Sequence, residues 1–312
     1  MKKISIATGE LQSRYGDREA LRIAKEAGAD AVDFCLEDFC GRYDYRNGGS
    51  VYSKSQAEIR EYFSDLKQYA DELGLEICQT HGRGCGFMAK ESEDDALLRN
   101  AEIDFFVTAI LGAPICVIHA VTTMFHPDAE PQFMRDLNFD MYTKLIPLAK
   151  KQGVKIATET FGDALDGKCC DFFGNIDEFI DSYNRICAVG DNADWLTVCV
   201  DTGHTNKASR FGDNPTPDEA IRMIGSNVTC LHLNDNNKMS DQHLIPYVAK
   251  RGARIEGVID WDKVFDSLDA IGYNGVFNLE LTLSRYGVEI MPEFCRFAIA
   301  VLRNALDQRE NG

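Results

Sequence analysis

The stretch Leu196-Thr-Val-Cys-Val-Asp-Thr-Gly-His204 decides the fold that this sequence predicts. Its first five residues are mostly β-branched and apolar without alternation, which is typical of a strand covered on both faces in a helix-wrapped parallel sheet. Asp201 follows directly, and we expect Gly203 to let the backbone turn so that His204 faces this carboxylate. The stretch therefore predicts a buried strand that ends in a metal ligand. The alternative is an Asp that caps the next turn beside a polar surface His.

Short apolar runs and amphipathic helical patterns alternate along the rest of the chain. The further strands are expected at residues 4–8, 31–36, 76–81, 115–119, 155–160, 227–232 and 276–280. Helices are expected at 17–27, 140–152, 177–188 and 293–307. Two more have clear start signals: one runs from the Ser55/Glu58 capping box to Gly74, and one runs from Ser92 with Asp95 to Gly112. Asp260 and Trp261 open a further helix. Eight strand-plus-helix units in 312 residues, 312/8 = 39 residues each, predict a single (β/α)8 TIM barrel with residues 1–312 as one domain.

Composition limits the classes of partner. The chain has 33 basic and 50 acidic residues and a net charge of −17, which disfavours binding to phosphate backbones or anionic membranes. No apolar run approaches the roughly 20 residues of a membrane span, and Met1-Lys-Lys leads directly into the first strand. We therefore expect a cytoplasmic protein, and its eleven cysteines are expected to be reduced thiols. The sequence leaves the oligomeric state open, homo-oligomers included.

The candidate functional side chains lie at the ends of the expected strands. The loops after strands are long, whereas the returns from helix to strand are short, so function is expected on the C-terminal rim of the barrel. Six successive strands end in a residue of a metal-ligand type: His81, His119, Glu159, Asp201, His232 and Glu280. Gathered at an apolar barrel mouth, these groups would carry unpaired charge unless a cation neutralised them. Oxygen and nitrogen donors without thiolate suit manganese, zinc, magnesium or cobalt.

The same motifs resemble those of a known superfamily. Similarity to the xylose-isomerase-like barrels, which include sugar isomerases, ketose 3-epimerases, inositol-pathway enzymes and endonuclease IV, covers nearly the whole chain and rests on Glu159, Asp201-Thr-Gly-His204, His232-Leu-Asn-Asp235 and Asn278-Leu-Glu280. It implies an epimerase metal quartet of Glu159, Asp201, His232 and Glu280. A second resemblance, to the endonuclease IV branch with up to three zinc ions, implies additional metal or substrate contacts by His81, His119, His204, Asp241 and His243.

The resemblance also implies a reaction. A divalent ion would chelate a substrate carbonyl and its neighbouring hydroxyl, and it would stabilise the enediolate formed when the α-proton leaves. Mn²⁺ and Zn²⁺ are the favoured ions, and Mg²⁺ and Co²⁺ are the alternatives. Glu159 and Glu280 would each act as ligand and as acid or base. The turn reads Asp235-Asn-Asn-Lys238, where epimerases typically have Glu-Asn-Asn-Arg.

Residues of the rim loops are candidates for substrate binding. A phosphate or carboxylate of the substrate could pair with Arg83, Lys207, Lys238 or Arg254. An apolar wall over a sugar ring could be formed by Tyr43, Tyr45, Phe87 and Phe161, whereas Trp261 is assigned to helix packing.

The sequence thus favours a metal-dependent sugar or sugar-phosphate isomerase or epimerase with a small carbohydrate substrate. Three alternatives remain: an endonuclease IV-like zinc-dependent abasic-site nuclease, an inosose-type dehydratase, and a catalytically silent metal- or sugar-binding barrel. A nuclease must neutralise several phosphates with Lys and Arg, which the acidic composition disfavours.

Overall fold

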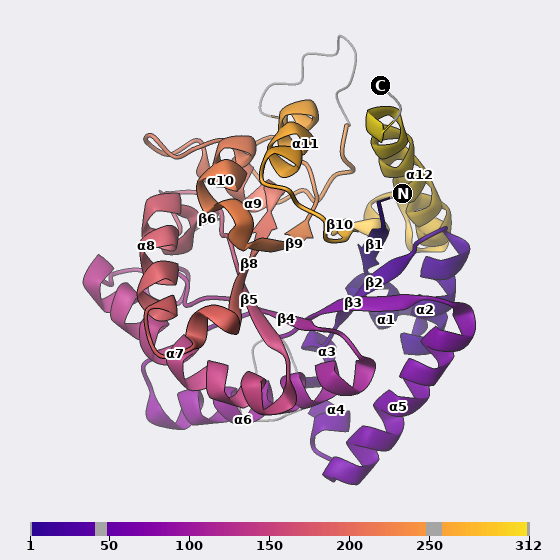
Figure 1. The fold of residues 1–312 in the computed structure, drawn as a ribbon, viewed down its shortest axis with the longest axis horizontal. Coiled ribbons are helices and arrows are strands. Elements are labelled where there is room, and N and C mark those ends of the chain that lie inside the picture. The colour runs from indigo at the N-terminus through magenta and orange to yellow at the C-terminus, as the bar shows by residue number, and fades with distance from the viewer. Residues whose placement is uncertain (1, 41–48, 248–257, 311–312) are drawn as a thin grey trace.

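Parallel strands form a barrel at the centre of the molecule (Figure 1). The computed structural model describes residues 2–40, 49–247 and 258–310. The barrel strands are β1 (Ile4–Ala7), β2 (Ala31–Cys35), β3 (Glu76–His81), β4 (Ile115–Ile118), β5 (Lys155–Glu159), β8 (Leu196–Asp201), β9 (Val228–His232) and β10 (Phe277–Leu279). Their order is β10-β1-β2-β3-β4-β5-β8-β9, and a bridge between Leu233 and Leu279 joins β9 to β10. The predicted (β/α)8 barrel is confirmed.

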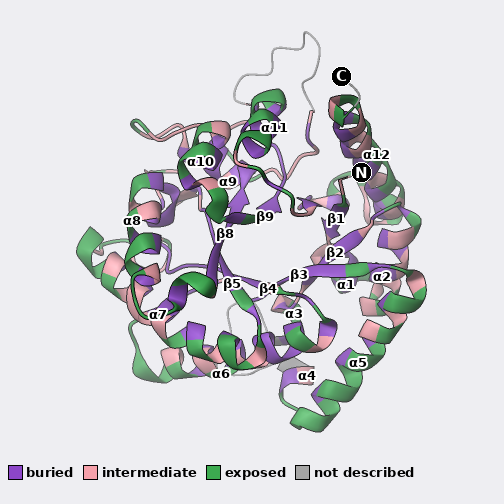
Figure 2. Cartoon of the chain, viewed as in Figure 1, coloured by how far each residue is buried: buried purple, intermediate pink, exposed green. Residues whose placement is uncertain are grey.

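Helices cover the outside of the barrel, and their outer faces are exposed while the strands are buried (Figure 2). The longer helices are α2 (Asp17–Glu26), α5 (Gln56–Leu73), α6 (Glu91–Leu111), α7 (Pro131–Gln152), α8 (Ile176–Cys187), α10 (Pro217–Ile224), α11 (Trp261–Ala270) and α12 (Met291–Glu310). Short helices follow three strands: α1 (Gly9–Tyr15), α3 (Glu37–Cys40) with α4 (Gly49–Tyr52), and α9 (Thr202–Ala208). Among the described residues, no helix combines the length and apolar character that crossing a membrane requires.

Several helix boundaries differ from those expected. The capping box of Ser55 and Glu58 is present, but α6 begins at Glu91 rather than Ser92. Its start is fixed by Asp94, which accepts hydrogen bonds from the backbone N–H groups of Met88 and Lys90 at 2.7 and 3.1 Å.

Besides the stretches that form the short helices α3, α4 and α9, two further stretches expected as loops contain regular structure. Residues 131–139 belong to α7, because Pro131 occupies the first turn, where its missing N–H costs no hydrogen bond. The loop after β5 forms a hairpin of β6 (Asp163–Ala164) and β7 (Cys169–Cys170).

The alternation of side chains along each strand sets the depth of the rim residues. Outward-facing residues such as Ile156 and Val198 pack against the helices in the main core. Inward-facing residues form a small interior layer, defined here as Val117, Ala157, Cys199 and Cys230. Each member lies two residues before a rim side chain, respectively His119, Glu159, Asp201 and His232. Because strand side chains alternate with period two, these four rim side chains point into the barrel directly above the interior layer.

Candidate metal centre at the barrel mouth

Six neighbouring strands bring the expected rim residues together. β3, β4, β5, β8, β9 and β10 are adjacent in the barrel, and they or the residue that follows them carry His81, His119, Glu159, Asp201, His232 and Glu280. Within this ring, ligand-type atoms of Glu159, Asp201, His232 and Glu280 all lie within 4.8 Å of one another. The structure therefore places the four side chains of the implied metal quartet around one point.

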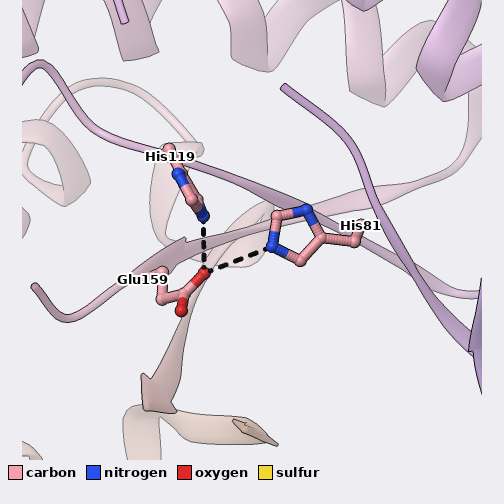
Figure 3. A group of neighbouring side chains, drawn as sticks. All are labelled: His81, His119 and Glu159. Atoms are coloured by element: carbon pink, nitrogen blue, oxygen red, sulfur yellow. Dashed lines mark ion pairs between the residues drawn. The ribbon is translucent and has the colours of Figure 1, made fainter. Parts of the chain in front are cut away.

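Glu159 is almost completely enclosed, with 1% of its side chain exposed. Its Oε2 atom lies 3.0 Å from His119 Nε2 and 3.7 Å from His81 Nε2, and both imidazoles face it (Figure 3). Its Oε1 atom lies 3.0 Å from His232 Nδ1 and 3.4 Å from His204 Nδ1. Burial alone would raise the pKa of Glu159, but the surrounding imidazoles hold this pKa well below its usual range.

Asp201 is held by both of its oxygens. Oδ1 accepts a hydrogen bond from the backbone N–H of His204 at 2.6 Å and thereby caps α9, while Oδ2 accepts one from the amide of Asn234 at 2.8 Å. The capping role considered as an alternative is therefore present, alongside the proximity to Glu159 and Glu280. Burial, together with these two neighbouring carboxylates, raises the pKa of Asp201 to about 7.

Gly203 has a different role from the one expected. It lies inside the first turn of α9 rather than in a free turn. A Cβ atom at this position would meet Asn234 Oδ1 at 1.8 Å and the Asn236 amide nitrogen at 2.9 Å. Glycine is therefore required here because the amide that holds Asp201 packs directly against the backbone of α9.

Replacing Gly203 by Ala is expected to lower the free energy of unfolding by about 1–3 kcal/mol, because the methyl group must displace Asn234. Denaturant unfolding measures this effect. Gly9→Ala is the matched control, since its Cβ would meet Cys35 Sγ at 3.4 Å and needs no rearrangement. Equal stabilities of the two variants would contradict the packing argument.

A second cluster lies at the outer edge of the ring. His204 Nε2 and His243 Nε2 each lie 3.4 Å from Asp241 Oδ2. Lys207 of α9 is 3.8 Å from Asp241 and forms an ion pair with Asp163 of the β6–β7 hairpin at 2.8 Å. The hairpin is thus fastened to the helix that carries His204.

A cavity of about 600 Å³ opens above both clusters. Its lining includes four histidines, Glu159, Glu280, parts of the β6–β7 hairpin, Lys207 and Phe161; the histidines are His81, His119, His204 and His243. Phe161 stacks on His204 with ring centroids 5.6 Å apart and meets His119 edge-on at 5.0 Å. It therefore supplies an apolar wall beside the candidate ligands.

Other expected substrate contacts lie elsewhere. Arg83 is 3% exposed and its guanidinium pairs with buried Asp104 of α6 at 2.7 Å, so we leave it out of the site. Lys238 is also not among the described residues that line the cavity, and Phe87 is buried in the main core. Trp261 begins α11, and its indole N–H donates to Asp235 at 2.8 Å. Arg254, Tyr43 and Tyr45 lie outside the described residues.

Two residues that the sequence did not single out contact the expected ligands and orient their side chains. Asn234 orients Asp201, and Asp33 of β2 lies 3.0 Å from His232 Nε2. Asp33 carried a signal, because a carboxylate stands in the middle of the apolar run at 31–36. Asn234 carried a weaker one, two residues beyond His232 in a polar turn.

The donor set fits a divalent cation. Oε2 of Glu159 and Oε2 of Glu280 are buried and accept no hydrogen bond of good geometry from the described residues, although His119 Nε2 lies 3.0 Å from the first and His232 Nδ1 lies 3.4 Å from the second. Buried carboxylate oxygens in this state are costly unless a cation pairs with them. Carboxylates and imidazoles without thiolate are the ligands of zinc, manganese, cobalt or magnesium rather than copper(I) or iron–sulfur clusters. Glu159, Asp201, His232 and Glu280 would hold the ion.

Metal binding is expected to release protons at pH 7. Burial opposes charge on His232, but neighbouring groups that include Cys199, Glu280 and Glu159 hold its pKa well above the usual value, and the pKa of Asp201 is about 7. An ion must displace these protons, so metal affinity should increase as pH rises from 6 to 9. Calorimetric titrations at pH 7 in two buffers of different ionisation enthalpy measure the release. Identical heats in both buffers would contradict it.

The fold and the clustered side chains define a parallel (β/α)8 barrel with a carboxylate–imidazole centre at its mouth. The chain belongs to the xylose isomerase-like TIM barrel family, whose model matches residues 21–300. An uncharacterized protein of Methanocaldococcus jannaschii is 30% identical over 165 residues, which are 51% of this chain and 48% of that protein. The match thus spans about half of each chain.

Solved structures share the fold over almost the whole chain. A D-tagatose 3-epimerase-like protein superposes with a TM-score of 0.71 at 16% identity, covering 99% of this chain and 98% of that one. The 3-keto-D-glucoside 4-epimerase from E. coli superposes with a TM-score of 0.66 at 17% identity, covering 97% of this chain and 100% of that one. The IolI protein, whose crystal structure contains a zinc atom, superposes with a TM-score of 0.67 at 15% identity, covering 97% of this chain and 95% of that one. At these identities, the likeness shows the shared fold.

Proposed function

We propose that this protein is a divalent-metal-dependent isomerase or epimerase of a sugar or sugar phosphate. The observation that carries the proposal is the convergence of Glu159 and Glu280 on one point together with Asp201 and His232. Structural neighbours that are sugar epimerases by name support the same class of reaction. Proton transfer next to a carbonyl requires a base and an acid beside a site that stabilises negative charge, and this set of side chains offers both.

Glu159 and Glu280 differ in access. Glu159 is enclosed by imidazoles, whereas 22% of the Glu280 side chain is exposed at the cavity. Burial would raise the pKa of Glu280, but His232 and His243 lower it to about 2. Both carboxylates are therefore ionised at neutral pH and able to accept a proton from a substrate carbon. A bound divalent ion would supply electrostatic stabilisation for the negative charge that develops on substrate oxygens.

The cavity lining combines apolar and hydrogen-bonding groups. Phe161 forms an apolar face and stacks on His204, which belongs to the adjoining His204–Asp241–His243 cluster of hydrogen-bonding groups. A polyhydroxylated molecule with an apolar ring or chain face suits this combination. We therefore propose a small carbohydrate as the substrate.

Incubation of the metal-loaded protein with a panel of ketoses and their phosphates in D₂O tests the proposal. The expected result is deuterium at the carbon next to the carbonyl of at least one compound, together with formation of an isomer or epimer. Loss of water from a cyclic ketone such as an inosose would instead indicate the dehydratase. A metal-loaded protein that incorporates no deuterium and releases no water with any of these compounds would contradict the proposal.

A second candidate function is favoured by the two additional clusters. His81 and His119 with Glu159, and His204 with Asp241 and His243, could each hold a further ion, as the resemblance to the endonuclease IV branch implies. Three ions would suit hydrolysis of a phosphodiester at an abasic site. Incision of an abasic duplex by the zinc-loaded protein tests this alternative. The net charge of −17 argues against it, because DNA binding depends on neutralising phosphates.

A further inference from the structure

Asp33 is a buried carboxylate inside the barrel that the proposed reaction does not use. It lies on β2 between the outward-facing Val32 and Phe34, so its side chain points inward. It has no exposed surface in the folded protein. An isolated carboxylate in this position would be strongly destabilising, so its contacts need an explanation.

Three side chains converge on one oxygen of Asp33. Oδ2 accepts hydrogen bonds from the amide nitrogen of Gln79 at 2.9 Å and from that of Asn278 at 3.3 Å, and it lies 3.0 Å from His232 Nε2. The amide of Asn278 is itself fixed, because its oxygen accepts a hydrogen bond from Ser5 at 2.8 Å. The register between β2 and β3 shifts at Val32/Asp33, which places Gln79 opposite Asp33.

These contacts determine how His232 is presented. An ionised carboxylate only accepts hydrogen bonds, so an Nε2 atom that pairs with Asp33 carries a proton. The amide nitrogen of Gln79 also lies 3.3 Å from this Nε2, but it donates to Asp33 at the shorter distance of 2.9 Å. The other ring nitrogen, Nδ1, lies 3.0 Å from Glu159 Oε1 and 3.4 Å from Glu280 Oε2. In the neutral imidazole, the lone pair is then on Nδ1 and is directed toward the other three clustered ligands.

We propose that Asp33 is a positioning residue, which fixes the tautomer and orientation of His232 so that Nδ1 binds the divalent ion. Asp33 does not touch the ion or the substrate in this role. It acts through the imidazole, as carboxylates behind metal-bound histidines do, and increases the basicity of the ligand nitrogen. The inference rests on the proposed metal centre, and it assigns Asp33 a share of the affinity of that centre.

The effect of Asp33→Asn on metal affinity tests the proposal without any substrate. The amide keeps the shape of the carboxylate but removes its charge, and its NH₂ group can donate to His232. We expect a 10- to 100-fold weaker affinity for Zn²⁺ or Co²⁺ in competition with a chromophoric chelator. Thr197→Val is the matched control, because it removes a buried hydroxyl that hydrogen-bonds to Thr229 and Asn227 at the opposite end of β8. This control should keep the affinity of the unaltered protein.

A second measurement uses the unaltered protein and so does not depend on the folding of a variant. In ¹⁵N-histidine spectra of the zinc-loaded protein, His232 should show a protonated Nε2 and a metal-bound Nδ1. Metal on Nε2, or an affinity of a folded Asp33→Asn protein within twofold of the unaltered protein, would overturn the proposal. If the unaltered protein binds no divalent ion, the metal centre itself is wrong. If it binds the ion but neither result appears, only the role of Asp33 is wrong.

Discussion

Replacing Glu159 or Glu280 by Gln is expected to reduce exchange of the substrate α-proton with solvent by at least about 10²-fold, and up to about 10⁴-fold. An amide cannot accept the proton, and it also removes one negative charge from the four clustered side chains. The measurement is deuterium incorporation from D₂O into the substrate found in the panel, with the metal content of each variant determined in parallel. A variant that keeps its ion but loses exchange separates the acid/base role from metal binding.

Glu178→Gln is the matched control for this pair. Glu178 lies on α8, away from the cavity lining, and forms an ion pair with Arg135, so the same chemical change is made outside the site. It should leave exchange within about twofold of the unaltered protein. If exchange persisted at full rate in both rim variants, the two-carboxylate mechanism would be wrong even if the protein binds metal.

Removal of the divalent ion is expected to abolish turnover and to lower the stability of the fold. Prolonged dialysis against a chelator should eliminate isomerisation, and adding back Mn²⁺, Zn²⁺, Co²⁺ or Mg²⁺ should restore it and rank these ions. Binding to the folded state alone stabilises a protein by about 2.7 kcal/mol when the ion is at 100 times its Kd. The thermal midpoint should therefore rise with metal concentration.

Elemental analysis provides the control for the removal experiment. The protein as purified should contain at least one divalent ion per chain, and the dialysed protein should contain almost none. Full activity in protein shown to be free of metal would rule out the assignment of Glu159, Asp201, His232 and Glu280 as an essential metal centre.

The barrel could be predicted from sequence because its strands are short apolar runs at regular spacing. The position of the rim residues could be predicted for the same reason, since parallel strands deliver their C-terminal residues to one end. The boundaries that differ were decided locally: Asp94 rather than Ser92 fixes the start of α6, and Pro131 starts α7 early.

Contacts between distant segments could not be predicted. Arg83 follows a strand and looks accessible in sequence, yet its partner Asp104 lies three turns into the next helix and holds it inside the protein. Asp33 and His232 are 199 residues apart, and only closure of the barrel places them side by side. The sequence around Gly203 does not show that Asn234, thirty-one residues later, occupies the space that a side chain at position 203 would need.

The interior layer of Val117, Ala157, Cys199 and Cys230 has a consequence for the order of events at the site. These four side chains are buried and packed together beneath the rim. In the proposed enzyme, the ion and the sugar would therefore both enter from the cavity side of the described residues. The ion would bind first, and a sugar bound above it would hold the ion in place until that sugar leaves.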